Sequence, residues 1–416
     1  MTTSWDVIVV GARCAGSPTA MLLARKGYRV LVVDKATFPS DVISTLVIHP
    51  HGVECLERWG LLDQVVDSGC PPIHTYVFDF GALTIAGSPG TAGSPVAYAP
   101  RRFVLDEVLV RAAAAAGAEV REGAIVEDVV IEDGRVVGIT GHRKTGGSFT
   151  ERAAIVIGAD GRYSRVADAV SAATYHEKPT VLASYYSYWS NLPMDGRFET
   201  YVRPNRGFAA LPTHDDRTLV IAGWPYAEFE ANKRDLEASY RRVFELAPSF
   251  AERLRGAKQE DRLFGATVPN FFRKPYGPGW VLVGDAGYIK DPITAQGITD
   301  AFHDAERCAA ALDLALSGTS SFEDAFADYQ RDRDDYALPR FDMTWQIATL
   351  APPPAELQQV LAAIHGNQAA MDAFVRLNAG IMSPAEFFAP EHLGPIMAAA
   401  QAGSTRGAPA APVHAR

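Results

Sequence analysis

Residues 5–35, WDVIVVGARCAGSPTAMLLARKGYRVLVVDK, contain a complete strand–helix–strand unit. Residues 7–10 form a short β-branched run bounded by glycine, which is typical of a strand buried on both faces of a parallel sheet. Apolar residues then recur at helical spacing over residues 15–26, and Gly27 is placed as a C-terminal stop. Residues 29–33 return as a second buried strand. This order predicts an α/β domain that holds a dinucleotide.

The turn at residues 11–16, GARCAG, matches the first and third glycines of the G-x-G-x-x-G fingerprint, and Arg13 stands at the second. Either the loop stands off the pyrophosphate, or the guanidinium itself faces phosphate, and we favour the second. Asp34 ends the second strand, where a carboxylate hydrogen-bonds ribose hydroxyls. A chance glycine-rich turn is the alternative, but the flanking strands, helix and acid count against it. The contacts predicted here are Gly11, Ala12, Arg13, Ala15, Gly16, Asp34 and Lys35.

The composition fits a globular protein with more than one structural unit. The 416 residues are 48% hydrophobic, and the formal charge of −10 argues against a nucleic-acid partner. The four cysteines have no metal-ligand or C-x-x-C spacing, so we expect no metal and a reduced, cytoplasmic compartment. We find no signal peptide and no apolar run long enough to span a membrane. The oligomeric state stays open.

The next segments alternate between loops, helices and hairpins. A loop over residues 35–52 leaves the second strand toward the reactive end of the cofactor, with Ser44, Thr45 and His49 as polar candidates. For His49, a hydrogen-bonded loop histidine is the alternative to a catalytic one. We expect helices at 53–59 and 101–116, a hairpin at 74–86, and a three-stranded meander over 124–149 that turns at 133–134. Val126 in this meander is a further candidate for cofactor binding.

Residues 175–268 change in composition toward aromatic strands, which predicts a second domain with its own sheet. Its aromatic residues could line an apolar pocket, although an ordinary strand core is the alternative for each of them. The pocket candidates are Tyr186, Tyr188, Tyr201, Phe208 and Trp224. A buried strand at 280–283 and a helix at 296–316 then return the chain to the first domain.

Three separated segments together resemble the FAD-dependent monooxygenases of the para-hydroxybenzoate hydroxylase type. They are the fingerprint with Asp34, GADGRYSRV at 158–166, and GDAG with DPITAQGI at 284–298. The form D-P-x-x-A-Q-G-I also resembles the geranylgeranyl reductase branch of that fold. The resemblance implies a Rossmann-like FAD-binding domain with a β-meander at 1–73, 100–174 and 270–320. It also implies an inserted antiparallel-sheet substrate domain at 74–99 and 175–269. The chain after that domain predicts C-terminal helices at 321–400, and the Gly/Ala/Pro-rich composition at 401–416 predicts a disordered tail.

The resemblance also implies roles for single residues. Arg102 would contact FAD near its ribityl and pyrophosphate portion, and Asp285 would hydrogen-bond the ribityl chain. Pro292 would lie over the flavin as part of the catalytic site, and Gly297 and Ile298 would offer backbone N–H groups to the pyrimidine edge. The motif with Asp160 and Gly161 would serve both FAD and NAD(P)H. Two positions depart from the pattern: Ala295 replaces a glycine, and the loop near Ser44 lacks an arginine that many hydroxylases have.

The implied function is an NAD(P)H-dependent FAD monooxygenase. It would hydroxylate an apolar, aromatic small molecule through a flavin C4a-(hydro)peroxide. The alternative is a flavin-dependent reductase or dehydrogenase of the geranylgeranyl reductase type, acting on a C=C bond. A flavin halogenase ranks lower, because the W-x-W-x-I-P motif is absent, and a non-catalytic flavoprotein ranks lower as well. With no second dinucleotide unit in the sequence, NAD(P)H would bind transiently along the groove at Asp160.

Overall fold

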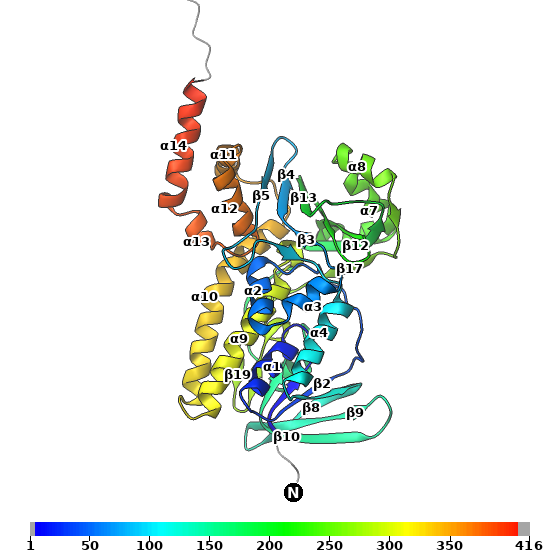
Figure 1. The fold of residues 1–416 in the computed structure, drawn as a ribbon, viewed down its shortest axis with the longest axis vertical. Coiled ribbons are helices and arrows are strands. Elements are labelled where there is room, and N and C mark those ends of the chain that lie inside the picture. The colour runs from blue at the N-terminus through cyan, green and yellow to red at the C-terminus, as the bar shows by residue number, and fades with distance from the viewer. Residues whose placement is uncertain (1–4, 407–416) are drawn as a thin grey trace, which may run out of the picture.

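The computed structural model of the chain describes residues 5–406, which form two lobes stacked along the long axis (Figure 1). The lower lobe contains a parallel sheet in which the predicted strands at 7–10 and 30–33 are buried at the centre. All strands on its main path are parallel except the edge strand β19. The order is β19 (Tyr276–Gly277), β20 (Trp280–Leu282), β10 (Ser148–Gly158), β1 (Trp5–Val10), β2 (Val30–Asp34) and β7 (Glu119–Glu122).

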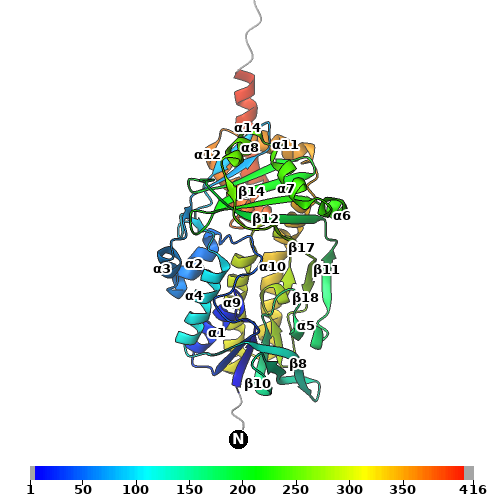
Figure 2. The ribbon, with the colours of Figure 1, turned by 90° about the vertical axis from the view of Figure 1, so that its right-hand side faces the viewer.

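Helices cover one face of this sheet, and the predicted meander covers the other (Figures 1 and 2). The helical layer consists of α1 (Gly16–Arg25), α4 (Arg102–Ala115) and α9 (Gly297–Leu316), with α2 (Pro50–Trp59) and α3 (Leu62–Asp67) beside them. The meander consists of β8 (Ala124–Glu132), β9 (Arg135–Arg143) and the first half of β10, and α5 (Arg165–Ala169) packs on it. Its turn has positive φ at both Asp133 and Gly134, 47° and 75°, as expected for a tight hairpin.

The upper lobe contains a second, mostly antiparallel sheet. Its order is β16 (Lys258–Gln259), β12 (Leu182–Ser190), β15 (Thr218–Pro225), β14 (Arg206–Pro212), β13 (Arg197–Arg203), β4 (Thr75–Asp79) and β5 (Thr84–Gly87), and β17 (Phe264–Thr267) also pairs with β12. The β4–β5 hairpin is the one predicted from residues 74–86. Most strands from 74–99 and 175–269 thus share a sheet. The exceptions are β6 (Ala97–Tyr98), which pairs with β3 (Pro72–Ile73), and β11 (Thr174–Lys178). The exact domain boundaries stay a prediction.

Two helices, α7 (Leu236–Phe244) and α8 (Pro248–Arg255), cover the outer face of the second sheet. The sequence predicted one amphipathic helix over 232–246. The structure instead has α6 (Phe229–Lys233) and then α7, because the Asp235 side chain accepts from the N–H of Ala238 and begins a new helix. The inner face of the sheet is turned toward the lower lobe and packs against Ala295 of that lobe.

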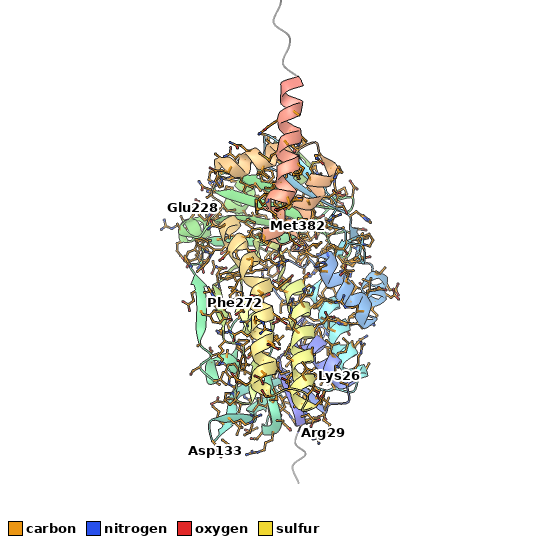
Figure 3. All side chains as sticks on the ribbon, turned by 90° about the vertical axis from the view of Figure 1, so that its left-hand side faces the viewer. Lys26, Arg29, Asp133, Glu228, Phe272 and Met382 are labelled. Carbon is orange, nitrogen blue, oxygen red and sulfur yellow. The ribbon has the colours of Figure 1, made fainter. Side chains whose placement is uncertain are left out.

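A small sheet and a long helix connect the lobes. The sheet consists of β11 (Thr174–Lys178), β18 (Asn270–Arg273) and β21 (Tyr288–Ile289). Helix α10 (Phe322–Ala348) lies beside α9, as Figure 3 shows. Phe272 of β18, which Figure 3 labels, packs edge-on against Phe341 of α10, with 5.1 Å between ring centroids. The small sheet and α10 are therefore joined by apolar packing as well as by the chain itself.

The C-terminal helices pack on the upper lobe (Figure 1). They are α11 (Ala355–Ile364), α12 (Gln368–Asn378), α13 (Pro384–Phe387) and α14 (Pro390–Arg406). The disordered tail predicted from residue 401 is wrong for residues 401–406, which continue α14, and residues 407–416 lie outside the described residues. Within residues 5–406, no helix is long and apolar enough to cross a membrane.

Candidate active site

The glycine-rich turn at 11–16 has no room for side chains at its two glycines. A Cβ added to Gly11 would lie 2.4 Å from the carbonyl oxygen of Ala159, and Gly11 has a φ of +103°. A Cβ added to Gly16 would lie 1.8 Å from the carbonyl oxygen of Gly11. The carboxylate of Asp34 accepts from the N–H of Ala12 at 2.7 Å. The ends of β1 and β2 and the start of α1 are thereby held together as the fingerprint predicts.

Arg13 and Arg102 share one buried carboxylate beside this turn. Asp106 is fully buried, and both guanidinium groups donate to it; the contact with Arg102 Nη2 is 2.9 Å. Arg13 also donates to the hydroxyl of Ser40 at 2.8 Å. Arg13, Asp106 and Arg102 form a trio that carries one net positive charge, which suits a pyrophosphate. That Arg13 itself faces phosphate stays a prediction, because its guanidinium is turned toward Asp106 and Ser40.

The remaining predicted contacts around this turn differ in exposure. Ala12 and Ala15 are buried, Lys35 is exposed at the end of β2, and Val126 lies in β8, which contacts β2. Burial raises the pKa of the Cys14 thiol to about 12, so this cysteine of the turn is an unreactive packing residue at neutral pH.

Asp160 is turned into the protein. It accepts from the Ser164 hydroxyl at 2.5 Å and from the N–H of Arg165 at 2.7 Å, and so holds the start of α5. Burial raises its pKa, although these hydrogen bonds oppose the rise. The sequence assigned Asp160 a cofactor contact, and the structure shows a carboxylate that shapes the turn. Gly161 beside it has a φ of +80°, as a tight turn requires.

Asp285 follows β20 and lies on the same side of the sheet as Arg102. The side chain is exposed to solvent, yet protein atoms crowd around it and raise its pKa to about 6. Arg102 and Arg162 oppose that rise. The contact of Asp285 with a ribityl chain stays a prediction.

The segment 290–297 is held by residues from distant parts of the chain. Lys290 pairs with Asp300 at 2.7 Å and donates to Gln296 at 2.6 Å. Gln296 in turn donates to the carbonyl of Asn378 at 3.0 Å, in α12. Asn270 accepts from the N–H of Asp291 at 2.8 Å. The segment also contains Pro292, the first residue of a short 3₁₀ turn. Its geometry is therefore fixed before any ligand binds.

His49 is one of the residues that fix this segment. Its Nε2 donates to the carbonyl of Thr294 at 3.1 Å, so Nδ1 must accept from the Tyr76 hydroxyl at 2.8 Å. Burial lowers the pKa of His49 to about 4, and the ring is neutral. Both ring nitrogens have protein partners, as in the hydrogen-bonded alternative. The catalytic role that the sequence offered for His49 has no free nitrogen to support it.

The N-terminus of α9 is open. Gly297 is exposed. Among the described residues, no atom beyond its chain neighbours and its own helix backbone lies within 4 Å of a Cβ placed on it, and no side chain caps the helix. The N–H groups of Gly297 and Ile298 and the positive end of the helix dipole can therefore receive an acceptor edge. The N-terminus of α1 at the fingerprint also has no side-chain cap. These features fit the parts of FAD. The open start of α1 and the excess positive charge suit the two phosphates, the acid at the end of β2 suits the ribose, and the open start of α9 suits the ring.

The FAD binding domain family matches residues 4–340 of this chain. The chain belongs to that family. A digeranylgeranylglycerophospholipid reductase of Methanocella arvoryzae is 30% identical over 315 residues, 72% of this chain and 75% of that protein. A tryptophan 2-halogenase of Chondromyces crocatus is 25% identical over 343 residues, 80% of this chain and 65% of the halogenase.

Among solved structures, a flavoprotein/dehydrogenase from Cytophaga hutchinsonii superposes with a TM-score of 0.81 at 21% identity, covering 97% of this chain and 100% of that one. A likeness at this identity supports the fold. The chain is an FAD-dependent oxidoreductase, and the resemblance, fold class and flavin cofactor predicted from the sequence are confirmed.

The five predicted pocket residues of this flavoprotein lie on opposite faces of the second sheet. Tyr186 and Tyr188 belong to the inner face, in one apolar cluster with Ala295. Tyr201, Phe208 and Trp224 belong to the outer face, in a cluster with residues of α7 and α8. The pocket prediction is wrong for Tyr201, Phe208 and Trp224, which pack in the core beneath α7 and α8, because alternate residues of a strand point to opposite faces. For Tyr186 and Tyr188 on the inner face it stays a prediction.

Sequence reasoning missed several residues near the inner face. Ser44 was predicted, and its N–H donates to the Tyr186 hydroxyl at 3.4 Å. The missed apolar residues, which share the cluster with Tyr186, include Leu46, Val47, Ile221 and Phe264. Arg101 was missed as well, and its guanidinium lies over the ring of Tyr188, 4.0 Å from the centroid. The adjacent arginine pair in the sequence was a signal, but only Arg102 matched a motif.

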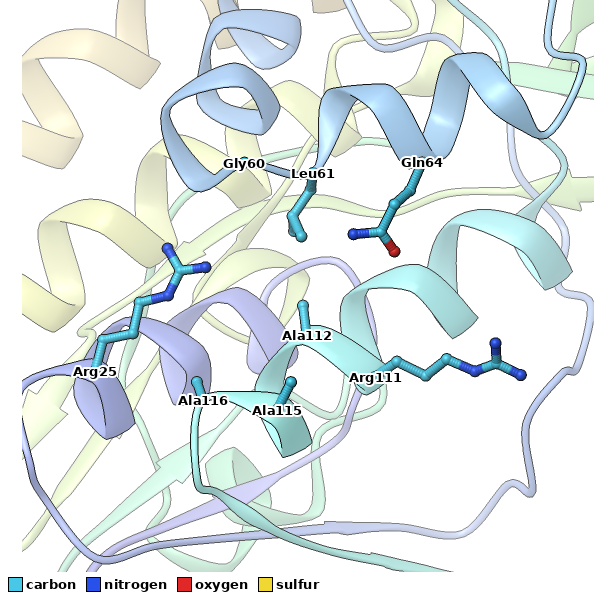
Figure 4. Close-up of a pocket in the computed structure, with 8 residues that line it drawn as sticks. All are labelled: Arg25, Gly60, Leu61, Gln64, Arg111, Ala112, Ala115 and Ala116. Carbon is cyan, nitrogen blue, oxygen red and sulfur yellow. The ribbon is translucent and has the colours of Figure 1, made fainter.

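A surface cavity of about 490 Å³ lies elsewhere in the lower lobe (Figure 4). Its lining comes from α1, from the junction of α2 and α3, and from α4: Arg25, Gly60, Leu61, Gln64, Arg111, Ala112, Ala115 and Ala116. None of the predicted site residues lines this cavity. Within residues 5–406, no cluster of three or more histidine, cysteine or acidic residues could hold a metal ion.

Proposed function

We propose that this flavoprotein is an NAD(P)H-dependent monooxygenase that hydroxylates a small aromatic molecule. The observation that carries the proposal is the character of the inner face of the second sheet. There, the hydroxyl groups of Tyr186 and Tyr188 belong to residues of an apolar cluster that includes Ala295, while the Tyr76 hydroxyl of the same cluster is already bonded to His49. Directional polar groups in an apolar surround suit a flat, substituted ring better than an unsubstituted isoprenoid chain.

The residues of the chain would hold FAD as follows. The Arg13–Asp106–Arg102 trio and the start of α1 would bind the pyrophosphate, Asp34 the ribose, and Asp285 the ribityl chain. Gly297 and Ile298 would face the pyrimidine edge, where the dipole of α9 stabilises the negative charge of a reduced ring. Bound FAD would supply the transfer of electrons from NAD(P)H to oxygen. The network around residues 290–297 and the apolar inner face would exclude water.

NAD(P)H would bind transiently beside the turn at Asp160. The carboxylate of Asp160 holds α5, so a direct contact with the nucleotide would come from neighbours of that turn. Arg162 is such a neighbour, because it donates to the carbonyl of Thr267 at 3.3 Å and lies close to Asp285. A guanidinium at this junction of the two lobes could pair with phosphate.

A reductase acting on a C=C bond is the second candidate. The relative that is 30% identical over 72% of this chain, named a digeranylgeranylglycerophospholipid reductase, favours it. Such an enzyme would bind an apolar chain along the same inner face and would need no oxygen.

Labelled oxygen separates the two functions. Purified FAD-loaded protein is incubated with NADH or NADPH, ¹⁸O₂ and a panel of hydroxybenzoates, indoles and naphthols. The proposal expects NAD(P)H oxidation to accelerate with a panel member and one labelled oxygen atom to appear in its product. Conversion of a C=C bond under strict anaerobiosis, with no labelled product in air, would assign the protein to the reductase class instead.

A further inference from the structure

Arg101 stands where the two lobes meet, one residue before α4. Its backbone N–H donates to Nδ1 of His214 at 3.1 Å, which ties the residue to the loop between β14 and β15. Its guanidinium carbon lies over the ring of Tyr188, 4.0 Å from the centroid. The arginine is thus fixed in the lower lobe while its charge faces an aromatic residue of the substrate face.

The guanidinium is only partly used by the protein. Nη2 donates to the carboxylate of Asp41 at 2.8 Å. Nε is buried and has no hydrogen-bond partner among the described residues. Nη1 makes no hydrogen bond to them either, and it is not among the fully buried unpaired atoms. An arginine has five N–H donors, so most of those on Arg101 are unused.

The one hydrogen-bond partner that the guanidinium has among the described residues, Asp41, is exposed. The Asp41 side chain is 39% accessible, whereas that of Arg101 is 13% accessible. An ion pair with one exposed partner contributes little to stability and can be exchanged for another anion. A planar guanidinium on a side chain that is held in place also has the geometry that binds a carboxylate through two hydrogen bonds.

We propose that Arg101 is a substrate-binding residue that selects aromatic acids. The substrate ring would lie on the inner face beside Tyr186 and Tyr188, and its carboxylate would pair with Nη1 of Arg101 and compete with Asp41. This inference rests on the proposed function, since it names the substrate class of the same site. An aromatic acid differs from the apolar aromatic molecule expected from the sequence in carrying one charged group.

The test measures binding without turnover. FAD-loaded, oxidised protein is titrated by calorimetry with matched acid and amide pairs: benzoate with benzamide, 2-naphthoate with 2-naphthamide, and indole-2-carboxylate with indole-2-carboxamide. Each pair has the same shape and differs in charge. We expect at least one acid to bind about tenfold or more tightly than its amide. Equal binding in every pair, or no binding by any acid, would overturn the proposal.

Two substitutions with opposite expected effects distinguish a residue that binds substrate from one that only fastens the loop through Asp41. Arg101→Gln should remove the preference for the acid and leave the affinity for the amide within about twofold. Asp41→Asn should strengthen acid binding, because it removes the competing carboxylate. If Arg101 only fastens the loop through Asp41, both variants will weaken binding alike, and the proposal is wrong.

Two further variants control the binding measurements. Arg111→Gln removes an exposed arginine of the same helix that pairs with Glu107, and it should change neither affinity. If Arg101→Gln does not fold, Arg101→Lys retains the charge without the planar guanidinium and should reduce the preference for the acid several-fold. If Arg101→Lys kept the full preference for the acid over the amide, two-hydrogen-bond recognition by the guanidinium would be contradicted. Because no reductant or oxygen is used, failure here leaves the labelled-oxygen test of the proposed function unaffected.

Discussion

Replacement of Asp291 by asparagine should stabilise this protein at alkaline pH. The side chain is 2% exposed, and burial raises its pKa to about 7 from an ordinary 3.8. Its Oδ1 accepts from the N–H of Ile293 at 3.0 Å, a contact that asparagine can keep. At about 1.4 kcal/mol per pKa unit, ionisation of the buried carboxyl lowers the free energy of unfolding by about 4 kcal/mol.

The sign of the pH dependence follows from proton binding. Between pH 3.8 and about 7 the folded state keeps a proton that the unfolded state has lost, so stability falls as pH rises through this window. Asparagine does not titrate. The advantage of Asp291→Asn should therefore be small at pH 4 and reach about 4 kcal/mol at pH 8, or roughly 5 °C in Tm for a chain of this size.

His49 provides a control of opposite sign. Burial lowers its pKa from 6.5 to about 4, so its contribution is present above pH 6.5 and is lost as pH falls toward 4. His49→Gln should therefore remove a rise in stability between about pH 4 and 6.5, whereas Asp291→Asn should remove a fall in stability between pH 3.8 and about 7. The assay is urea unfolding of the FAD-loaded protein at pH 4.5, 6 and 8, followed by tryptophan fluorescence. A loss of stability in Asp291→Asn at pH 8, or the same difference at every pH, would refute the reasoning.

Three further predictions use the same preparation. Arg13→Ala should weaken FAD binding about tenfold or more in titrations of apoprotein, because a charge-assisted contact contributes about 1.5–3 kcal/mol; unchanged affinity would contradict the role of this arginine. Gly297→Ala should keep the Tm of the apoprotein, since no atom lies within 4 Å of the added Cβ, but should lower FAD affinity, whereas Gly16→Ala should not fold. Phe208→Ala should cost about 3–5 kcal/mol of stability without changing KM. Tyr186→Phe should instead raise KM at an unchanged Tm. The reverse pattern would mean that the two faces of the sheet are misassigned.

The lower lobe could be predicted because its signals are local. A buried β-branched strand, a turn that excludes any Cβ and a helix with a glycine stop are written within residues 5–35. The same holds for the meander, whose turn needs positive φ at Asp133 and Gly134. The strands, the helix and the hairpin turn depend on neighbours in the sequence. The lack of room at Gly11 is a tertiary contact, because an added Cβ would meet the carbonyl oxygen of Ala159, but the spacing of the fingerprint already marks that glycine in the sequence.

The inner face of the second sheet could not be predicted, because strand β12 is apolar on both sides. Tyr185 and Trp189 face the cluster of α7 and α8, and Tyr186 and Tyr188 face the opposite cluster. Alternation of polar and apolar residues would have marked the solvent side of a half-exposed sheet. Here both faces are covered, and the helices that cover the outer face lie later in the chain.

The partners of residues 290–297 could not be predicted for a different reason. The carbonyl of Asn378, the side chain of Asn270 and the ring of His49 come from three segments that meet only in the folded protein. Polar residues of this kind look like ordinary loop or helix residues in the sequence. The C-terminal helices, which matched no motif, therefore contribute directly to the geometry of residues 290–297.

The division of the site between the two lobes bears on how one fold can support different reactions. Relatives named as a reductase and as a halogenase align with 72% and 80% of this chain, so the FAD-binding elements alone do not decide which reaction follows. In this protein those elements are rigid, because buried pairs such as Lys290 with Asp300 hold them. The inner face instead joins two lobes through side chains of both, Arg101 over Tyr188 and Ser44 beside Tyr186. Substitutions there can change which substrate is enclosed without disturbing the flavin, and for that reason the choice between hydroxylation and reduction should follow the inner face.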